Sequence, residues 1–112
     1  MSEDRFAALT DAQELDRLFA RSHDAPVVLF KHSLTCPISR TAYEEMRRLD
    51  EPVAMVVVQR ARGVSNEIAA RTGVRHETPQ ALVLRRGGVV WSASHWDVTA
   101  EAVTRAVRES AA

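Results

Sequence analysis

The sequence predicts one α/β domain in which a four-stranded mixed sheet carries helices on both faces. Three observations predict this class: helical and strand-like apolar patterns alternate, two adjacent runs form a hairpin, and 112 residues suit one domain. Because 46% of the residues are hydrophobic and 27% are charged, the chain can bury an ordinary core. No linker, repeat or low-complexity segment divides it, so we treat residues 1–112 as a single domain.

The first predicted elements are a helix over residues 11–22 and a strand over residues 27–30. Thr10 and Gln13 match a capping box at the start of the helix, and Leu15 begins an apolar stripe of helical spacing. The strand is a continuous apolar run, which is typical of a strand covered on both faces.

The middle of the chain predicts a second helix, a second strand and a short third helix. Pro37 suits the first position of a helix, and its apolar stripe extends to Leu49. Residues 53–58 are all apolar and form the strongest strand pattern in the chain. The short helix is expected over residues 65–72, with Gly73 at its carboxyl end.

The last part of the chain predicts a hairpin and a terminal helix. Strands over residues 80–84 and 89–91 flank a Gly-Gly pair, and a helix follows over residues 99–109. The predicted order therefore begins with a helix, and the strands end near Cys36. Open α/β sheets place their sites at such strand ends.

Charge and composition exclude several functional classes. Fifteen basic and fifteen acidic residues balance to zero, which favours neither a nucleic-acid partner nor a membrane surface. No apolar run approaches the ~18 residues that span a bilayer, and the charged N-terminus differs from a signal peptide. We therefore expect a cytoplasmic protein. The single cysteine, Cys36, excludes an intramolecular disulfide and a zinc site built from this chain's cysteines alone.

Cys36 lies where a buried strand is followed by a helix, within the segment KHSLTCPIS of residues 31–39. Free backbone N–H groups and the positive end of the helix dipole favour a thiolate at that junction. Because the thiolate is the nucleophile of thiol–disulfide exchange, the position predicts a reactive cysteine. A small, inert, buried cysteine is the alternative.

Four neighbours are candidates for supporting the thiolate: Thr35, Pro37, Ser39 and His32. Ser39 occupies the place of the resolving thiol in a C-x-x-C pair, so an external thiol must resolve any mixed disulfide on Cys36. Ser39 is either an ordinary residue of the first helical turn or a hydrogen-bond partner of the sulfur. His32 would stabilise the thiolate as an imidazolium or act as a general base; otherwise it is a partly exposed residue at a strand end.

Thr78 and Pro79 form the second candidate element, between the short helix and the hairpin and beside the Cys36 loop. We expect a cis peptide bond here, although most X–Pro bonds in folded proteins are trans. A cis bond leaves the backbone of Thr78 exposed, so that it can pair with an extended thiol ligand. A proline that simply begins a strand is the alternative.

His95, Trp96 and Asp97 form the third candidate element, between the last strand and the last helix. A helix N-terminus suits the polar end of a ligand, so we expect at least one of these residues to bind it. Capping, surface and core positions are the alternatives. The histidines and Cys36 show no close ligand spacing, so no metal site is expected.

These segments resemble a known family. The order of elements, the Cys-Pro helix start and the Thr-Pro before the hairpin resemble the thioredoxin fold. More closely, residues 31–39, residues 65–69 with 73–80, and residues 94–97 resemble the monothiol bacilliredoxins. The motifs TCPIS and SHW are the specific part of this resemblance, which covers nearly the whole chain.

The resemblance implies an activity, a co-substrate and a class of partner. Bacillithiol is a small thiol made of cysteine, glucosamine and malate that caps protein cysteines under oxidative stress, and this family is thought to remove the cap. By analogy, Cys36 takes bacillithiol from a bacillithiolated protein. Free bacillithiol then regenerates Cys36 and leaves as bacillithiol disulfide.

The malate end of bacillithiol carries two carboxylates, for which the chain offers two candidate cations. Lys31 resembles in its place the basic residue that similar glutaredoxins hold for a carboxylate of glutathione, and Arg75 is the competitor. A solvated surface lysine is the alternative for Lys31. Two other functions stay open: a thioredoxin-like adaptor with an inert Cys36, and a monothiol glutaredoxin that uses another small thiol.

Overall fold

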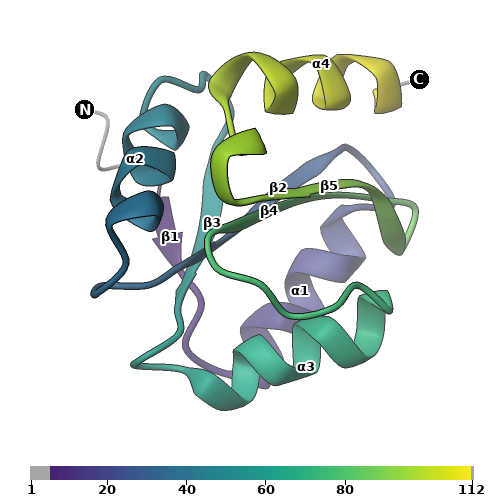
Figure 1. The fold of residues 1–112 in the computed structure, drawn as a ribbon. Helices are drawn as coiled ribbons and strands as arrows, with labels where there is room; N and C mark the ends of the chain where they lie inside the picture. The colour runs from purple at the N-terminus through teal and green to yellow at the C-terminus, as the bar shows by residue number, and fades with distance from the viewer. Residues whose placement is uncertain (1–5, 112) are drawn as a thin grey trace.

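The apolar runs of the sequence become the inner strands of a mixed sheet in the computed structural model, which describes residues 6–111 (Figure 1). The elements follow in the order β1 (Phe6–Ala8), α1 (Ala12–Arg21), β2 (Val27–His32), α2 (Pro37–Met46), β3 (Val53–Val57), α3 (Arg62–Thr72), β4 (Gln80–Arg85), β5 (Gly88–Ser94), the 3-10 helix η2 (His95–Asp97) and α4 (Ala100–Ser110).

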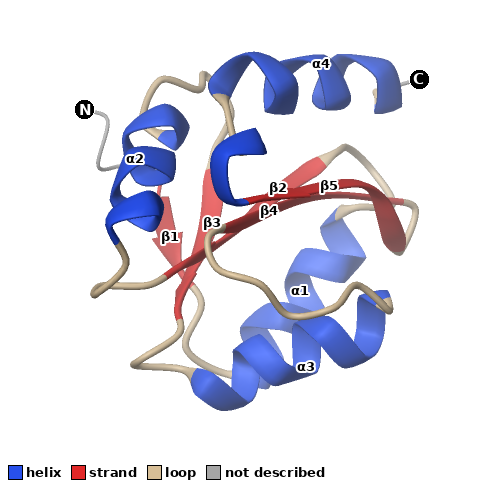
Figure 2. Ribbon diagram, viewed as in Figure 1, coloured by secondary structure: helices blue, strands red, loops and turns tan. Residues whose placement is uncertain are grey.

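The sheet has the strand order β1-β3-β2-β4-β5, with β2 at its centre. β2 pairs in parallel with β3 and antiparallel with β4, and β5 completes the hairpin with β4 at one edge. Figure 2 shows the strands twisting through the middle of the molecule between the helices. The α/β class predicted from the alternation of patterns is confirmed.

The prediction of four strands is wrong, because β1 adds a fifth at the other edge of the sheet. β1 has only three residues and is mostly exposed, so its sequence carries no periodic apolar run. It is held by parallel pairing with β3 and by the Phe6 ring, which stacks on Tyr43 with 5.0 Å between ring centroids. Tertiary contacts, rather than local pattern, form this strand.

The first helix begins differently from the prediction. Its N-cap is Asp11, whose Oδ1 accepts a hydrogen bond of 2.8 Å from the backbone N–H of Glu14. The Glu14 carboxylate in turn accepts the backbone N–H of Thr10 at 2.8 Å. The predicted capping box of Thr10 and Gln13 is therefore wrong by one residue, because two carboxylates satisfy these N–H groups instead.

Other boundaries move by a few residues. Helix α2 ends at Met46, and Leu49 is buried from the following turn rather than from the helix itself. Helix α3 begins three residues before its predicted start and ends as predicted at Gly73, whose φ of +72° is left-handed. Strand β5 continues to Ser94, so the candidate segment 94–97 starts inside the sheet.

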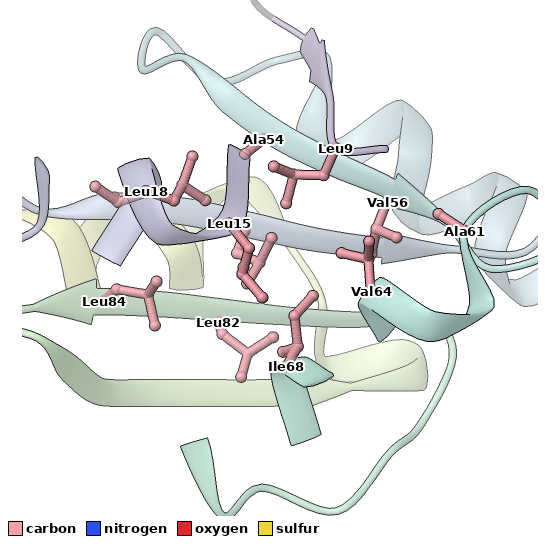
Figure 3. Packing of buried hydrophobic residues seen from close by; sticks show 12 residues of the cluster. Leu9, Leu15, Leu18, Ala54, Val56, Ala61, Val64, Ile68, Leu82 and Leu84 are labelled. Atoms are coloured by element: carbon pink, nitrogen blue, oxygen red, sulfur yellow. The ribbon is translucent and has the colours of Figure 1, made fainter. Parts of the chain in front are cut away.

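Two hydrophobic clusters fill the space between the sheet and its helices. Helices α1 and α3 cover one face, where Leu15, Leu82 and Ile68 point toward one another (Figure 3). Helices α2 and α4 cover the other face, with Met46 and Val103 among the buried side chains. Because both faces are covered, the carboxyl ends of β2 and β3 are the place where polar side chains can meet. Within residues 6–111, no helix is long and apolar enough to cross a membrane.

Candidate active site

Cys36 is the N-cap of α2 and stands at the end of the short loop that follows β2. Its backbone is extended, Pro37 occupies the first helical position, and the thiol is partly exposed. No side chain of the described residues caps this helix, so the N–H groups of its first turn have no side-chain acceptor from the N-cap. The helix dipole favours a negative charge there. The structure thus places Cys36 where the sequence predicts it.

Ser39 is fully buried and is used to hold the loop that carries Cys36. Its Oγ accepts a hydrogen bond of 2.9 Å from the backbone N–H of Ser33 and makes a second of 2.8 Å with Nδ1 of His32. Ser39 is therefore neither an ordinary helix residue nor, among the hydrogen bonds of the described residues, a partner of the sulfur. It connects the first turn of α2 to the end of β2.

His32 supports the site through this hydrogen bond rather than through charge. Burial lowers the pKa of His32 below its usual value of 6.5, so the ring is neutral at neutral pH. It lies between the rings of Phe30 and Tyr43, with centroids 5.6 and 5.2 Å away. A neutral ring does not supply the imidazolium considered above, and its fixed orientation suits a positioning role.

Gln59, which the sequence analysis does not identify, holds the same loop from the turn that follows β3. Its Oε1 accepts the backbone N–H of Leu34 at 3.1 Å, and its Nε2 donates to Ser33 Oγ at 2.9 Å. A longer contact of 3.4 Å reaches the hydroxyl of Thr35. No motif includes Gln59, but its position just after the strand parallel to β2 is a usable signal. Such positions share the sheet edge at which the Cys36 loop begins.

The second and third candidate elements lie together. The Thr78–Pro79 peptide bond is cis, and the backbone N–H of His95 donates to the carbonyl of Pro79 at 2.9 Å. His95 Nε2 also lies 3.6 Å from a carboxylate oxygen of Glu77. The left-handed φ of His95, +56°, turns the chain from β5 into η2. Two segments that are 16 residues apart in sequence (95 − 79) thus form one unit.

The solvent-facing part of this unit consists of Thr78, Trp96 and Asp97. Thr78 is partly exposed and Pro79 is buried, whereas Trp96 is 66% exposed. The η2 segment, which contains Trp96 and Asp97, packs against α2 and directly follows β5 (Figure 1). Trp96 and Asp97 are exposed there.

Lys31 occupies a different environment from either expectation, because its side chain is fully buried. It shares a face of β2 with Leu29, under α1 and α3, and burial lowers the pKa of Lys31 to about 8. Within residues 6–111, Nζ has no hydrogen-bond partner, nor has Oε1 of its cross-strand neighbour Gln80. Lys31 is thus not a surface lysine. Arg75, by contrast, is exposed in the loop after α3.

A cavity of about 720 Å³ opens beside Cys36. It is lined by residues 32–37 and, on α2, by Arg40, Tyr43 and Glu44. Thr78, Pro79 and residues 95–97 are not part of this lining, so the cavity is separate from the unit that Pro79 and His95 form. Across the described part of the chain, no three His, Cys, Asp or Glu side chains gather as metal ligands.

Comparison with known proteins points to one family and one fold. The family model described as monothiol bacilliredoxin matches residues 7–103. A solved protein described as a candidate oxidoreductase with a thioredoxin fold is 29% identical, with a TM-score of 0.86 over 94% of this chain and 96% of its own.

Two thioredoxins show the same fold at lower identity. Mitochondrial thioredoxin 3 of Saccharomyces cerevisiae is 13% identical, with a TM-score of 0.73 over 97% of this chain and 99% of its own. A mutant thioredoxin of Halobacterium salinarum is 17% identical, with a TM-score of 0.72 over 100% of this chain and 96% of its own.

Proposed function

Because the chain belongs to the monothiol bacilliredoxin family, we propose that it is a thiol–disulfide oxidoreductase that removes bacillithiol from bacillithiolated proteins. The observation that carries this proposal is the chemistry at the start of α2. Cys36 is partly exposed there beside a cavity, and the position of a second thiol holds the buried hydroxyl of Ser39. The proposal places the exchange in the cytoplasm, where protein thiols are kept reduced.

In the first step, the Cys36 thiolate attacks the bacillithiol sulfur of the mixed disulfide. A disulfide forms between Cys36 and bacillithiol, the original disulfide breaks, and the substrate cysteine leaves as a thiolate. The N-terminus of α2 stabilises the attacking anion, and the hydrogen bonds of Ser39 and Gln59 hold the loop that presents it.

In the second step, a free bacillithiol thiolate attacks the bacillithiol sulfur attached to Cys36. The products are bacillithiol disulfide and the Cys36 thiolate. Over the two steps the substrate cysteine is reduced to a thiol, the free bacillithiol is oxidised, and the bacillithiol that formed the cap stays at the disulfide level. The hydroxyl of Ser39 cannot act as a resolving thiol, which is why the second thiol has to come from outside the chain.

The cis-proline side of Cys36 suits the protein substrate. Thr78 precedes β4 and takes part in none of the loop hydrogen bonds of residues 6–111, so its backbone can pair with an extended peptide. Exposed Trp96, next to the His95 that bonds to Pro79, offers an apolar contact. This arrangement supports binding a segment of unfolded or flexible substrate around its modified cysteine.

The test is the intact mass of the reduced protein after mixing with bacillithiol disulfide or, separately, with glutathione disulfide. We expect a rapid single adduct with bacillithiol that free bacillithiol removes, and no adduct on Cys36→Ser. Equal, slow labelling by both disulfides would mean an ordinary thiol and would favour the adaptor function. Faster labelling by glutathione disulfide would favour a different small thiol.

The variant Ser39→Cys tests the monothiol character directly. A thiol at this position is expected to displace bacillithiol from Cys36, so that the adduct becomes transient and an internal disulfide replaces it. The wild-type adduct should persist under the same conditions until a thiol is added. A wild-type adduct that disappears without added thiol would contradict the proposed two-step cycle.

A further inference from the structure

The two sides of Cys36 differ in their chemistry. Toward β5, the unit of Thr78, Pro79 and η2 offers backbone and an exposed indole. On the face of α2 that carries Arg40 and Tyr43, the cavity of about 720 Å³ offers a guanidinium, hydroxyls and a carboxylate. The stacking of Tyr43 on Phe6 shows that this cavity lies on the β1 side of the helix. A ligand attached to Cys36 can therefore extend in either of two directions.

Arg40 is the distinctive residue of the cavity. It lies one helical turn after Cys36, so both residues are on the same face of α2. Its side chain is exposed, and no hydrogen bond or ion pair within residues 6–111 engages its guanidinium. Arg47 and Arg48 at the end of the same helix bond to Glu44 and Glu45, each at 3.2 Å. Arg40 thus presents an available cation next to the reactive sulfur.

The rest of the cavity wall is suited to a polar, multiply charged small molecule. The ring of Tyr43 is held between Phe6 and His32, with centroids 5.0 and 5.2 Å away, so this wall is preorganised. The charge of Glu44 is offset by its ion pair with Arg47. Thr35 lines the cavity together with Cys36. A carboxylate bound here would find Arg40 as its partner.

We propose that this cavity is the subsite for the small-thiol half of the mixed disulfide, in which Arg40 binds a carboxylate of that thiol. The inference rests on the proposed function and extends it. Attack by the Cys36 thiolate puts the leaving sulfur opposite the attacking one, so the two halves of the disulfide need separate places. The small thiol fits the cavity, and the protein half leaves along the cis-proline side. A guanidinium binds carboxylates in bidentate geometry, which adds orientation to charge.

The other cations predicted for this task are less suitable. Lys31 is fully buried on the opposite face of the sheet from α2 and does not line the cavity. Arg75 is exposed, but it lies in the loop after α3 and also does not line the cavity. Among the residues that line the cavity with Cys36, the arginine is Arg40.

The experiment compares Arg40→Ala with the wild-type chain against three disulfides: bacillithiol disulfide, glutathione disulfide and uncharged hydroxyethyl disulfide. The measurement is the second-order rate of adduct formation at Cys36, followed by intact mass. We expect an about tenfold loss with both anionic disulfides, equivalent to ~1.4 kcal/mol, and a change below about twofold with the neutral one. Arg40→Lys should recover part of the rate as a point charge.

The matched control is Arg48→Ala, which removes an exposed arginine outside the cavity and should leave all three rates unchanged. An equal loss with the neutral disulfide would overturn the proposal, because Arg40 would then act on Cys36 itself. Unchanged rates for Arg40→Ala, or an equal loss for Arg48→Ala, would also overturn it. If the wild-type chain does not prefer bacillithiol disulfide, the proposed function fails, and glutathione disulfide still decides whether Arg40 binds the small thiol.

Discussion

The two ends of the paired strands β2 and β4 differ in whether their buried polar groups are hydrogen-bonded. At the end away from Cys36, the guanidinium of Arg85 donates to the carbonyls of Ser22, His23 and Ser110 at 3.0, 3.0 and 2.9 Å. At the Cys36 end, Nζ of Lys31 and Oε1 of its paired residue Gln80 are buried without a partner in the described part of the chain.

This difference teaches how the fold separates stability from chemistry. A satisfied buried arginine joins three chain segments, and its hydrogen bonds to charged groups stabilise the native state. Unsatisfied buried groups lower stability, since each loses hydration without a replacement. The stabilising end therefore holds the sheet together, and the end that carries the reactive cysteine retains polar groups that destabilise it.

The largest expected effect is the loss of the Arg85 hydrogen bonds at the end of the sheet away from Cys36. Arg85→Ala should lower the free energy of unfolding by roughly 4 kcal/mol, because three carbonyls lose a charged donor. Urea unfolding followed by circular dichroism measures this, with exposed Arg108→Ala as the control. The rate at Cys36 should not change while the variant is folded. A loss below about 1 kcal/mol would mean that Arg85 does not organise this end.

The opposite sign is expected at the Cys36 end for Lys31→Met, which replaces a buried ammonium by an apolar side chain of similar length. The pKa of Lys31 is about 8 when folded and 10.5 as its ordinary value. The folded state thus binds fewer protons than the unfolded state between these two pH values. The loss of stability caused by burying the charged ammonium is fully present below about pH 8. It disappears as the pH rises to 10.5.

Lys31→Met is accordingly expected to be more stable than wild type by about 3 kcal/mol at pH 7, at 1.36 kcal/mol per pH unit of pKa difference. Urea unfolding at pH 7, 8, 9 and 10 should show the advantage shrinking as wild type gains stability. An advantage that does not change with pH would show that the pKa of Lys31 is the same in the folded and unfolded states, so that burial does not penalise its charge. A destabilised variant would show that its Nζ has a partner.

A smaller loss of stability is expected for Ser39→Ala. This variant should change both the free energy of unfolding and the reaction rate of Cys36. It removes the acceptor of the buried Ser33 N–H and the partner of His32, and should cost about 2 kcal/mol of unfolding free energy. The rate at Cys36 should also fall, because the loop loses its attachment to α2. Exposed Ser92→Ala serves as the control and should change neither quantity. A stable variant with a normal rate would refute the positioning role of Ser39.

The smallest expected effect on stability is that of Gln59→Ala, since this side chain is exposed. We expect less than about 1 kcal/mol in the free energy of unfolding and an about threefold slower reaction of Cys36 with disulfides. Exposed Gln13→Ala is the matched control. If the rate is unchanged, the hydrogen bonds to Leu34 and Ser33 do not position the thiol.

Much of the fold and part of the site could be predicted from local patterns. The helix start at Cys36 and Pro37 depends on neighbours in sequence, and so does the end of α3 at Gly73. The features that the sequence did not predict depend on residues far away in the chain. β1 forms because it pairs in parallel with β3. Gln59 becomes part of the site because β2 and β3 end at the same edge of the sheet.

Lys31 and His32, neighbours in one strand, show how far sequence spacing alone can predict the environment of a side chain. Adjacent residues of a strand point to opposite faces, so one cation is buried under α1 and α3 and the other side chain joins the rings of Phe30 and Tyr43. Sequence spacing predicts the alternation but not which helices cover each face. The burial that lowers both pKa values is therefore a property of the packed sheet.

The sequence by itself determined the α/β class, the single thiol at a helix start and the serine in place of a second thiol, since each depends on residue identity and near neighbours. Only the tertiary structure decided the burial of Lys31, the bonds of Ser39 and Gln59, and the joining of Pro79 to His95. These features require segments far apart in sequence to meet. Hydrogen bonds and burial arise from that meeting, and no local pattern encodes it.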